Sequence, residues 1–267
     1  MNIFKKGLFG LVSAISLMGV SSTAQAHFQL VYTPEVNIEK PGKIPFRIIF
    51  WHPMENGFVM DMGKPQEFFY IFKSEKTDLL SSLKPITFTG KDSKAAAFET
   101  EIDIKRNGDY IVGLVPEPYY EKSEDKYIQQ LTKSFLNKGG VPSDWNEPVG
   151  MKTEIIPLNK PTNILTGSTF SGVVLSEGKP VAGAEIEIEY MSAEPDLKTN
   201  TPQEAKAEPA VGGTIVAITD ENGVFTFGIP KSGFWGFAAL GVGPDKTYKE
   251  KELSQDAVIW IYASDLK

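Results

Sequence analysis

The sequence predicts an all-β protein made of two antiparallel β-sandwich domains, with one short helix near residues 124–137. Three observations support this fold class. From residue 28 onward, short runs rich in β-branched and aromatic residues alternate with clusters of Gly, Pro and Asn. Residues 184–190 alternate small or apolar with acidic side chains, which is typical of a strand with one buried face. Hydrophobic residues make up 41% and charged residues 23% of the chain, which indicates a globular protein with a core.

The first 26 residues have the features of a secretory signal peptide. Lys5 and Lys6 form a basic start, residues 8–20 form a short apolar run, and residues 24–26 read Ala-Gln-Ala, a small-x-small cleavage site. We expect cleavage after Ala26, which makes His27 the first residue of a protein exported to the periplasm. The chain has no cysteine to carry a lipid at the cleavage site, so we expect the processed protein to have no membrane anchor.

Length and charge narrow the class of protein further. Removing 26 of the 267 residues leaves 241, enough for two domains of about 120 residues each. We expect these domains over residues 27–160 and 161–267. Loss of the two signal lysines takes the formal charge from −7 to −9, which argues against nucleic acid as a partner and favours cations.

The first domain is predicted to contain six strands and the helix. The strands are expected over residues 28–32, 44–52, 67–73, 86–89, 97–104 and 109–115. Ser123 is placed to cap a helix that runs to about Asn137 and stops at Gly139 and Gly140. The apolar residues spaced for one face of that helix are Tyr127, Ile128, Leu131 and Phe135. We interpret the acidic residues from Glu121 as charge that favours the helix start.

The second domain follows a proline-punctuated crossing segment, residues 141–161, with the boundary near Lys160. Its strands are expected over residues 170–175, 184–190, 214–219, 224–229, 234–240 and 258–262. The Glu185, Glu187 and Glu189 face of the alternating strand is predicted to face solvent. Residues 191–212 are polar without an apolar period and are interpreted as a solvated loop.

The two histidines of the chain are the main candidate site residues. Cleavage before His27 would give one residue two nitrogen donors, the α-amine and the imidazole, which can chelate a single metal ion. His27 begins the first predicted strand and His52 ends the second, so antiparallel pairing would bring the two to one sheet edge. The resulting three-nitrogen site would suit nickel, cobalt, copper or zinc.

Weaker candidate ligands follow His52 in the chain. Glu55, Met60 and Met62 are expected to touch the metal or the residues around it, and Met54 is a poorer candidate. The alternatives are structural: methionines more often fill gaps in a core, and a lone histidine at a strand end often bonds to a backbone carbonyl. We expect no enzyme, because cysteine nucleophiles are absent, a Ser-His pair would need one of these histidines, and no phosphate-binding loop appears.

Several segments of the chain resemble the DUF4198 family. They are residues 26–28, 52–55, 116–121, 124–129 and 232–240. Members of this family are commonly described as periplasmic components of nickel or cobalt uptake systems. The resemblance therefore implies delivery of nickel or cobalt to a membrane importer of the ABC or energy-coupling-factor type. Residues 178–184 and 219–225 resemble a carboxypeptidase-regulatory or transthyretin-like domain, which implies sandwiches of the immunoglobulin or transthyretin type.

The sequence thus favours a binding protein that captures a divalent transition metal, nickel or cobalt first, through His27 and His52. One alternative is a copper protein with a histidine brace, either a chaperone that also uses the methionines or an oxidative enzyme. Another is a surface adhesin in which two sandwiches space a binding loop and His27 has no special role.

Overall fold

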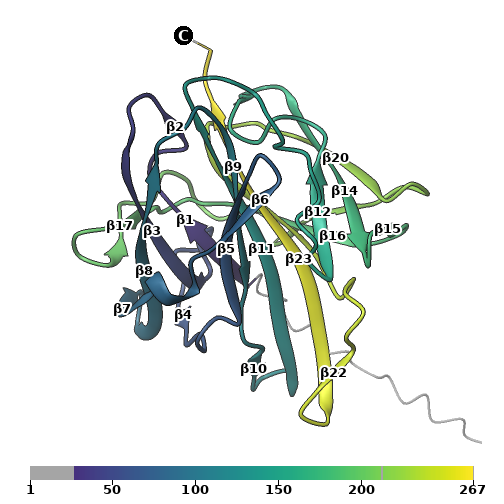
Figure 1. Cartoon of the computed structure of the whole chain (residues 1–267). Helices are drawn as coiled ribbons and strands as arrows, with labels where there is room; N and C mark the ends of the chain where they lie inside the picture. Colours follow the sequence, from purple (N-terminus) through teal and green to yellow (C-terminus); the bar gives the residue numbers. More distant parts are fainter. Residues whose placement is uncertain (1–26, 212, 267) are drawn as a thin grey trace, which may run out of the picture.

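The computed structural model describes residues 27–211 and 213–266 and confirms an all-β fold (Figure 1). The predicted signal segment lies outside the described residues. Within them, the one helical element is the three-residue 3-10 turn η1, Leu80–Ser82. No helix in this part of the chain has the length and apolar character needed to cross a bilayer.

A five-stranded sheet contains the first strands of the chain. Its order is β1, β3, β8, β7, with β4 paired to β3. The bounds are β1 Phe28–Tyr32, β3 Gly42–Trp51, β4 Val59–Met60, β7 Lys84–Gly90 and β8 Ser93–Ile104. All pairings are antiparallel, and the β1 to β3 register sets Phe28 opposite Trp51.

A twelve-stranded sheet forms the middle layer of the molecule (Figure 1). Its main path is β19, β16, β21, β23, β11, β9, β5, β6, and the short strands β2, β10, β13 and β22 pair at its sides. The main-path bounds are β5 Glu67–Phe72, β6 Glu75–Asp78, β9 Gly108–Val115, β11 Lys126–Lys138, β16 Glu185–Tyr190, β19 Ile215–Ile218, β21 Gly233–Ala239 and β23 Lys251–Ser264. The side strands are β2 Asn37–Ile38, β10 Tyr119–Glu121, β13 Ile164–Leu165 and β22 Thr247–Tyr248.

A four-stranded sheet and a small two-stranded sheet complete the fold. The first contains β12 Thr153–Pro157, β14 Thr169–Ser176, β15 Lys179–Pro180 and β20 Val224–Gly228, and the second contains β17 Pro195–Asp196 and β18 Thr201–Pro202. One core lies between the four-stranded and twelve-stranded sheets, around Phe170 and Phe237. Two further cores, around Trp51 and Phe46, lie between the five-stranded and twelve-stranded sheets. The large sheet is therefore buried on both faces.

The predicted helix at 124–137 is wrong, because this segment is the thirteen-residue strand β11. It pairs in parallel with β23 and antiparallel with β9 and β10. The helix prediction assumed that the polar residues between the apolar ones face water. Instead Gln129, Lys133 and Asn137 are each at most 5% exposed and have polar partners inside the protein. Since polar and apolar positions are both buried, their spacing does not mark a helix face.

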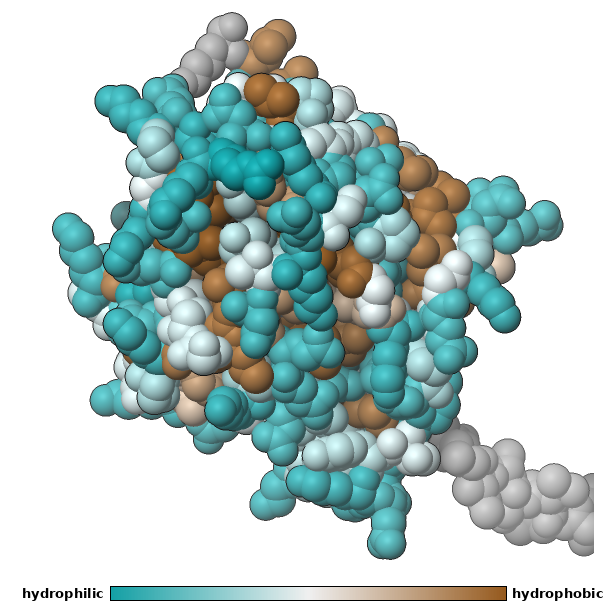
Figure 2. Space-filling view, viewed as in Figure 1, coloured by the Kyte–Doolittle hydropathy of each residue, from teal (hydrophilic) through white to brown (hydrophobic). Residues whose placement is uncertain are grey.

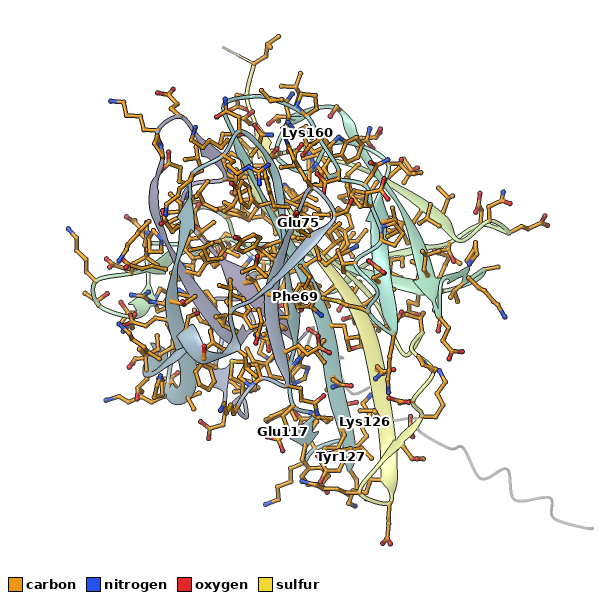
Figure 3. The ribbon with its side chains drawn as sticks, in the orientation of Figure 1. Phe69, Glu75, Glu117, Lys126, Tyr127 and Lys160 are labelled. Atoms are coloured by element: carbon orange, nitrogen blue, oxygen red, sulfur yellow. The ribbon has the colours of Figure 1, made fainter. Side chains whose placement is uncertain are left out.

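The predicted boundary near Lys160 falls between two strands, and pairings in two sheets cross it. Lys160 lies near one end of the molecule (Figure 3). β11 from before this residue pairs with β23 from after it, and β12 from before it pairs with β14. The sequence did not predict these pairings, and the division into two domains stays a prediction.

Two solvent-exposed features predicted for the second half are wrong in part. Glu187 and Glu189 are only 7% and 2% exposed, because the strand that carries them lies inside the large sheet, and Glu185 alone of the three faces water. In the predicted solvated loop, Met191 and Ala193 are buried in the core beneath β1 and β3.

The visible surface in Figure 2 is mostly hydrophilic, with apolar residues in separate patches.

Candidate metal site

The structure brings His27 and His52 together as the strand register requires. Phe28 pairs with Trp51, so the residues one step further out face each other across β1 and β3. The ring centroids of the two histidines are 4.6 Å apart and the rings are tilted by 55°. Both side chains are buried, at 9% and 1% exposure. The expected meeting of the histidines at one sheet edge is confirmed, while their role as metal ligands stays a prediction.

The His27 ring is held by a carboxylate from β10. Nε2 of His27 lies 3.0 Å from Oε2 of Glu121. Burial raises the pKa of Glu121, but hydrogen bonds from the Ser123 hydroxyl and N–H, together with His27, outweigh it and leave that pKa below its usual range. An ionised carboxylate only accepts hydrogen bonds, so Nε2 of His27 donates, and in the neutral form of the ring Nδ1 then carries the lone pair. This is the ring nitrogen that can chelate together with the α-amine of the same residue.

Sequence reasoning missed Glu121, which it interpreted as charge at a helix start. The residue lies 94 positions from His27 and meets it only because β10 folds back along β11. A carboxylate that bonds the second nitrogen of a ligand histidine is a common companion of protein metal sites. The signal available in the sequence was the position of Glu121 at the end of the 116–121 segment on which the family resemblance rests.

A tight turn holds His52 beside its partner. The N–H of Gly57 donates to the carbonyl of His52 at 3.1 Å, and Nε1 of Trp51 donates to the Gly57 carbonyl at 3.0 Å. A side chain at Gly57 would come within 3.2 Å of the His52 Cβ, so the glycine permits this close approach. The turn therefore fixes the end of β3 against the start of β1.

Aromatic rings surround the two histidines. Phe50 lies 5.8 Å from the His27 ring and Phe58 lies 4.8 Å from the His52 ring, centroid to centroid. Tyr119 packs edge-on against Phe50, and burial together with Glu121 raises the pKa of its hydroxyl. Phe58 is 40% exposed, so the aromatic wall has one edge at the surface. The surroundings are largely apolar, which strengthens any charge interaction at the histidines.

A family model described as a domain of unknown function, DUF4198, matches residues 24–243. The chain belongs to this family. No curated protein matches the sequence. The match covers both histidines and Glu121, and thus the whole candidate site of this DUF4198 protein.

Solved structures with similar chains share little sequence with it. The D0–D1 domain of intimin is 10% identical, with 86% of this chain and 96% of that chain covered and a TM-score of 0.20. Fibronectin(III)-like modules of CbhA from Clostridium thermocellum are 7% identical, with 89% and 95% covered and a TM-score of 0.22. A putative membrane anchored protein from Corynebacterium diphtheriae is 14% identical, with 89% and 59% covered and a TM-score of 0.23. TM-scores and sequence identities this low support no inference about the site of this DUF4198 protein.

The weaker candidate ligands have other contacts. Glu55 is exposed, and its charge acts on the buried Glu189 of β16. Met60 is buried opposite Phe50, and Sδ of Met62 lies 3.9 Å from Nε2 of Gln29. Both methionines belong to the core around Phe46. Their role as ligands stays a prediction.

In the described part of the chain, acidic and histidine side chains alone do not form a metal site. Among residues 27–211 and 213–266, no group of three or more His, Asp or Glu side chains has an arrangement that could hold a metal ion. Two imidazoles and the α-amine of a processed chain would give three nitrogen donors. The donor set therefore fits a transition metal only if the amine of His27 is free.

Proposed function

We propose that this protein is exported, loses residues 1–26, and captures a divalent transition metal through the α-amine and imidazole of His27 and the imidazole of His52. The ion is its cargo, which it delivers to a membrane importer of the ABC or energy-coupling-factor type. Nickel and cobalt are the proposed metals, because family members are commonly described as parts of nickel or cobalt uptake systems. The protein acts by binding and carries out no catalysis.

The observation that carries this proposal is the contact between the only two histidines of the chain, 4.6 Å apart, at the predicted new terminus. The hydrogen bond between Glu121 and Nε2 of His27 supports this proposal, because it does not involve Nδ1. Nδ1 is the ring nitrogen nearer to the backbone of His27, and therefore to the α-amine. Three neutral nitrogen donors leave open positions on the metal. Open positions suit a carrier, since an importer's own ligands can enter and remove the ion.

The decisive experiment compares two forms of the protein that differ by one residue. One form begins at His27 and the other carries an extra alanine before it, which turns the amine into an amide. Each is titrated with nickel, cobalt, copper and zinc by calorimetry. We expect the extension, and separately His52→Ala, each to weaken binding by at least about 100-fold, since each removes one nitrogen donor. Equal affinity of the two forms would exclude the chelate.

A copper function is the second candidate, because an amine and two imidazoles are also the donors of a copper histidine brace. Copper binds such donors more tightly than nickel or cobalt does. The copper-loaded processed protein is mixed with ascorbate, and oxygen consumption is followed. Turnover that is lost in His52→Ala would favour an oxidative enzyme, whereas tight copper binding without turnover would favour a copper carrier.

A further inference from the structure

A cavity of about 100 Å³ lies beside His27, on the β11 side of β1. We name it the carboxylate cavity. Its polar lining consists of His27, Glu124, Lys126, Gln130, Glu187, Ser254 and Asp256. The strands that supply it are β11, β16 and β23, which are neighbours or near neighbours in the large sheet. Lys126 marks its place near the lower end of β11 in Figure 3.

Glu187 is a buried carboxylate that lacks a partner in this cavity. It is 7% exposed, and no hydrogen bond or ion pair joins it to any described residue. Burial, reinforced by the charge of Asp256, raises its pKa to about 7. The one lysine of the lining, Lys126, is ion-paired to Glu124 at 2.5 Å. The ionised form of a buried carboxylate without a partner is stabilised by a cation that enters the cavity.

Asp256 lies beside Glu187 and is bound by neutral donors. Oδ1 of Asp256 accepts hydrogen bonds from the Gly241 N–H at 2.8 Å and the Ser254 hydroxyl at 2.6 Å. Its other oxygen is 3.3 Å from Nε2 of Gln130, a long contact that leaves room for a better donor. The cavity therefore has acceptors from Glu187 and Asp256, besides the Glu124 carboxylate that is paired with Lys126.

The backbone of His27 faces this cavity. Gln130 donates from Nε2 to the His27 carbonyl at 2.7 Å, and its Oε1 accepts from the Gln29 N–H at 2.7 Å. In an extended strand, the nitrogen and the carbonyl of one residue point to the same edge, and residues two apart share that edge. The nitrogen of His27 therefore points toward Gln130 and the carboxylates behind it, while its ring lies on the sheet face with His52.

We propose that the carboxylate cavity is the binding site for the α-ammonium group of the processed chain, with Glu187 and Asp256 as its acceptors. The inference rests on the proposed function in one respect, the cleavage after Ala26. Glu187 and Asp256 are positioning residues: they hold the amine beside the His27 ring before a metal arrives. An ammonium fits better than a bound metal ion, because the acidic and histidine side chains of the described residues include no metal-holding group of three.

The test measures how fast the α-amine is acylated in the metal-free processed protein, with a chelator present. A slow acylating reagent is used, and the modified N-terminal peptide is quantified by mass spectrometry. We expect Glu187→Gln and Asp256→Asn each to speed acylation by about tenfold, the factor that corresponds to one charge-assisted hydrogen bond. Glu185→Gln is the matched control, since it lies two residues away on the same strand but is exposed. Rates equal to that control would overturn the proposal.

A crystal structure of the metal-free processed protein tests the same point without a variant. The α-nitrogen is expected within hydrogen-bond distance of a carboxylate oxygen of Glu187 or Asp256, and an amine directed elsewhere would contradict the inference. Metal titration of the same protein separates the two proposals. If the α-amine is bound in the carboxylate cavity but the protein binds no metal, the proposed function alone is refuted. If the protein binds metal tightly but the amine reacts as fast as an exposed one, the proposed role of the carboxylate cavity alone is refuted.

Discussion

At the scale of single residues, the candidate site depends on side chains of ordinary type placed by distant strands. Two histidines could be predicted from the sequence, because the chain has no others and the signal motif marks one of them. Glu121, Glu187 and Asp256 could not be predicted, because the chain has many acidic residues and only sheet pairing brings Glu121 to His27 and the other two to the cavity beside it. Burial changes their chemistry, and burial is what the sequence pattern predicted wrongly for Glu187 and Glu189.

Glu121 is expected to act on the metal through His27. Glu121→Ala removes the acceptor that fixes the ring, so we expect metal affinity to fall by about 10- to 100-fold. Glu121→Gln keeps an acceptor oxygen for the His27 ring, so it should lose less metal affinity than Glu121→Ala. A purely structural role of Glu121 would not explain this difference. Calorimetric titration with nickel measures both, and Glu117→Gln is the control, since Glu117 precedes β10 on the same segment (Figure 3). Loss of affinity as large in the control would refute this role.

Glu189 is expected to make stability depend on pH. Burial raises its pKa well above the usual range, and the Glu55 charge adds to the rise. The folded protein then keeps a proton that the unfolded chain releases above a pH of about 4.3, so stability is lost as the pH rises. We expect Glu189→Gln to raise the free energy of unfolding by about 1–3 kcal/mol at pH 8 and to change it little at pH 4.

Urea denaturation at the two pH values measures the effect of Glu189→Gln. The amide oxygen can still accept the hydrogen bond that the Met54 N–H donates to Glu189 at 2.8 Å. Glu185→Gln, on the exposed end of the same strand, should change stability little at either pH. A gain of the same size at pH 4 and pH 8 would show that the proton at Glu189 is not responsible.

At the scale of elements, β11 is where the sequence was most misleading. Its buried polar residues pair with side chains from other strands: Gln129 with Gln255, Lys133 with Glu154 and Asn137 with Asp109. A strand with polar groups on both buried faces has no simple apolar period, and the sequence gives no sign of where its partners lie. The strands with apolar runs, such as β1, β5 and β9, were predicted to within about two residues.

The Lys133 to Glu154 pair is expected to contribute strongly to the stability of β11. The two residues are 2.8 Å apart and their side chains are 1% and 4% exposed, and burial lowers the pKa of Lys133 although Glu154 opposes this. Lys133→Met leaves the Glu154 charge buried without its partner, which costs about 3–5 kcal/mol of unfolding free energy. Lys133→Met with Glu154→Gln should cost less, because no unpaired charge remains.

Thermal and urea denaturation of these variants measure the pair, with an exposed pair as the control. Lys43 lies 3.7 Å from Glu101 and their side chains are 71% and 58% exposed. Lys43→Met should cost less than about 1 kcal/mol. A Lys133→Met variant as stable as the control would mean that Glu154 is satisfied without the lysine, through the N–H groups of Val149 and Gly150 that it also accepts.

At the scale of the whole molecule, one sheet joins the two halves of the chain. Along the path from β19 to β6, four strands that follow Lys160 are succeeded without a break by four strands that precede it, and the two groups meet where β23 and β11 lie side by side (Figure 1). The all-β class and most strands could be predicted from turn residues and apolar runs. The shared sheet could not, because parallel pairing of distant strands leaves no local pattern.

The shared sheet predicts that neither half folds by itself. A fragment of residues 27–160 would leave one edge of β11 without β23 and leave β12 without its partner β14. We expect this fragment and residues 161–267 each to lack dispersed NMR spectra, and the processed full chain to unfold in one cooperative thermal transition. A folded fragment, or two separate transitions, would show that the halves are independent domains.

The pairing of β11 with β23 also constrains when this protein acquires its shape. Gln129 and Gln255, which bond across that pair, are 126 residues apart, and β23 is the final strand of the described chain. A nascent polypeptide therefore cannot close its central layer until β23 has been made, and contacts between such distant positions form slowly. Until that moment β11 lacks its partner β23, and this delay is compatible with the proposed export.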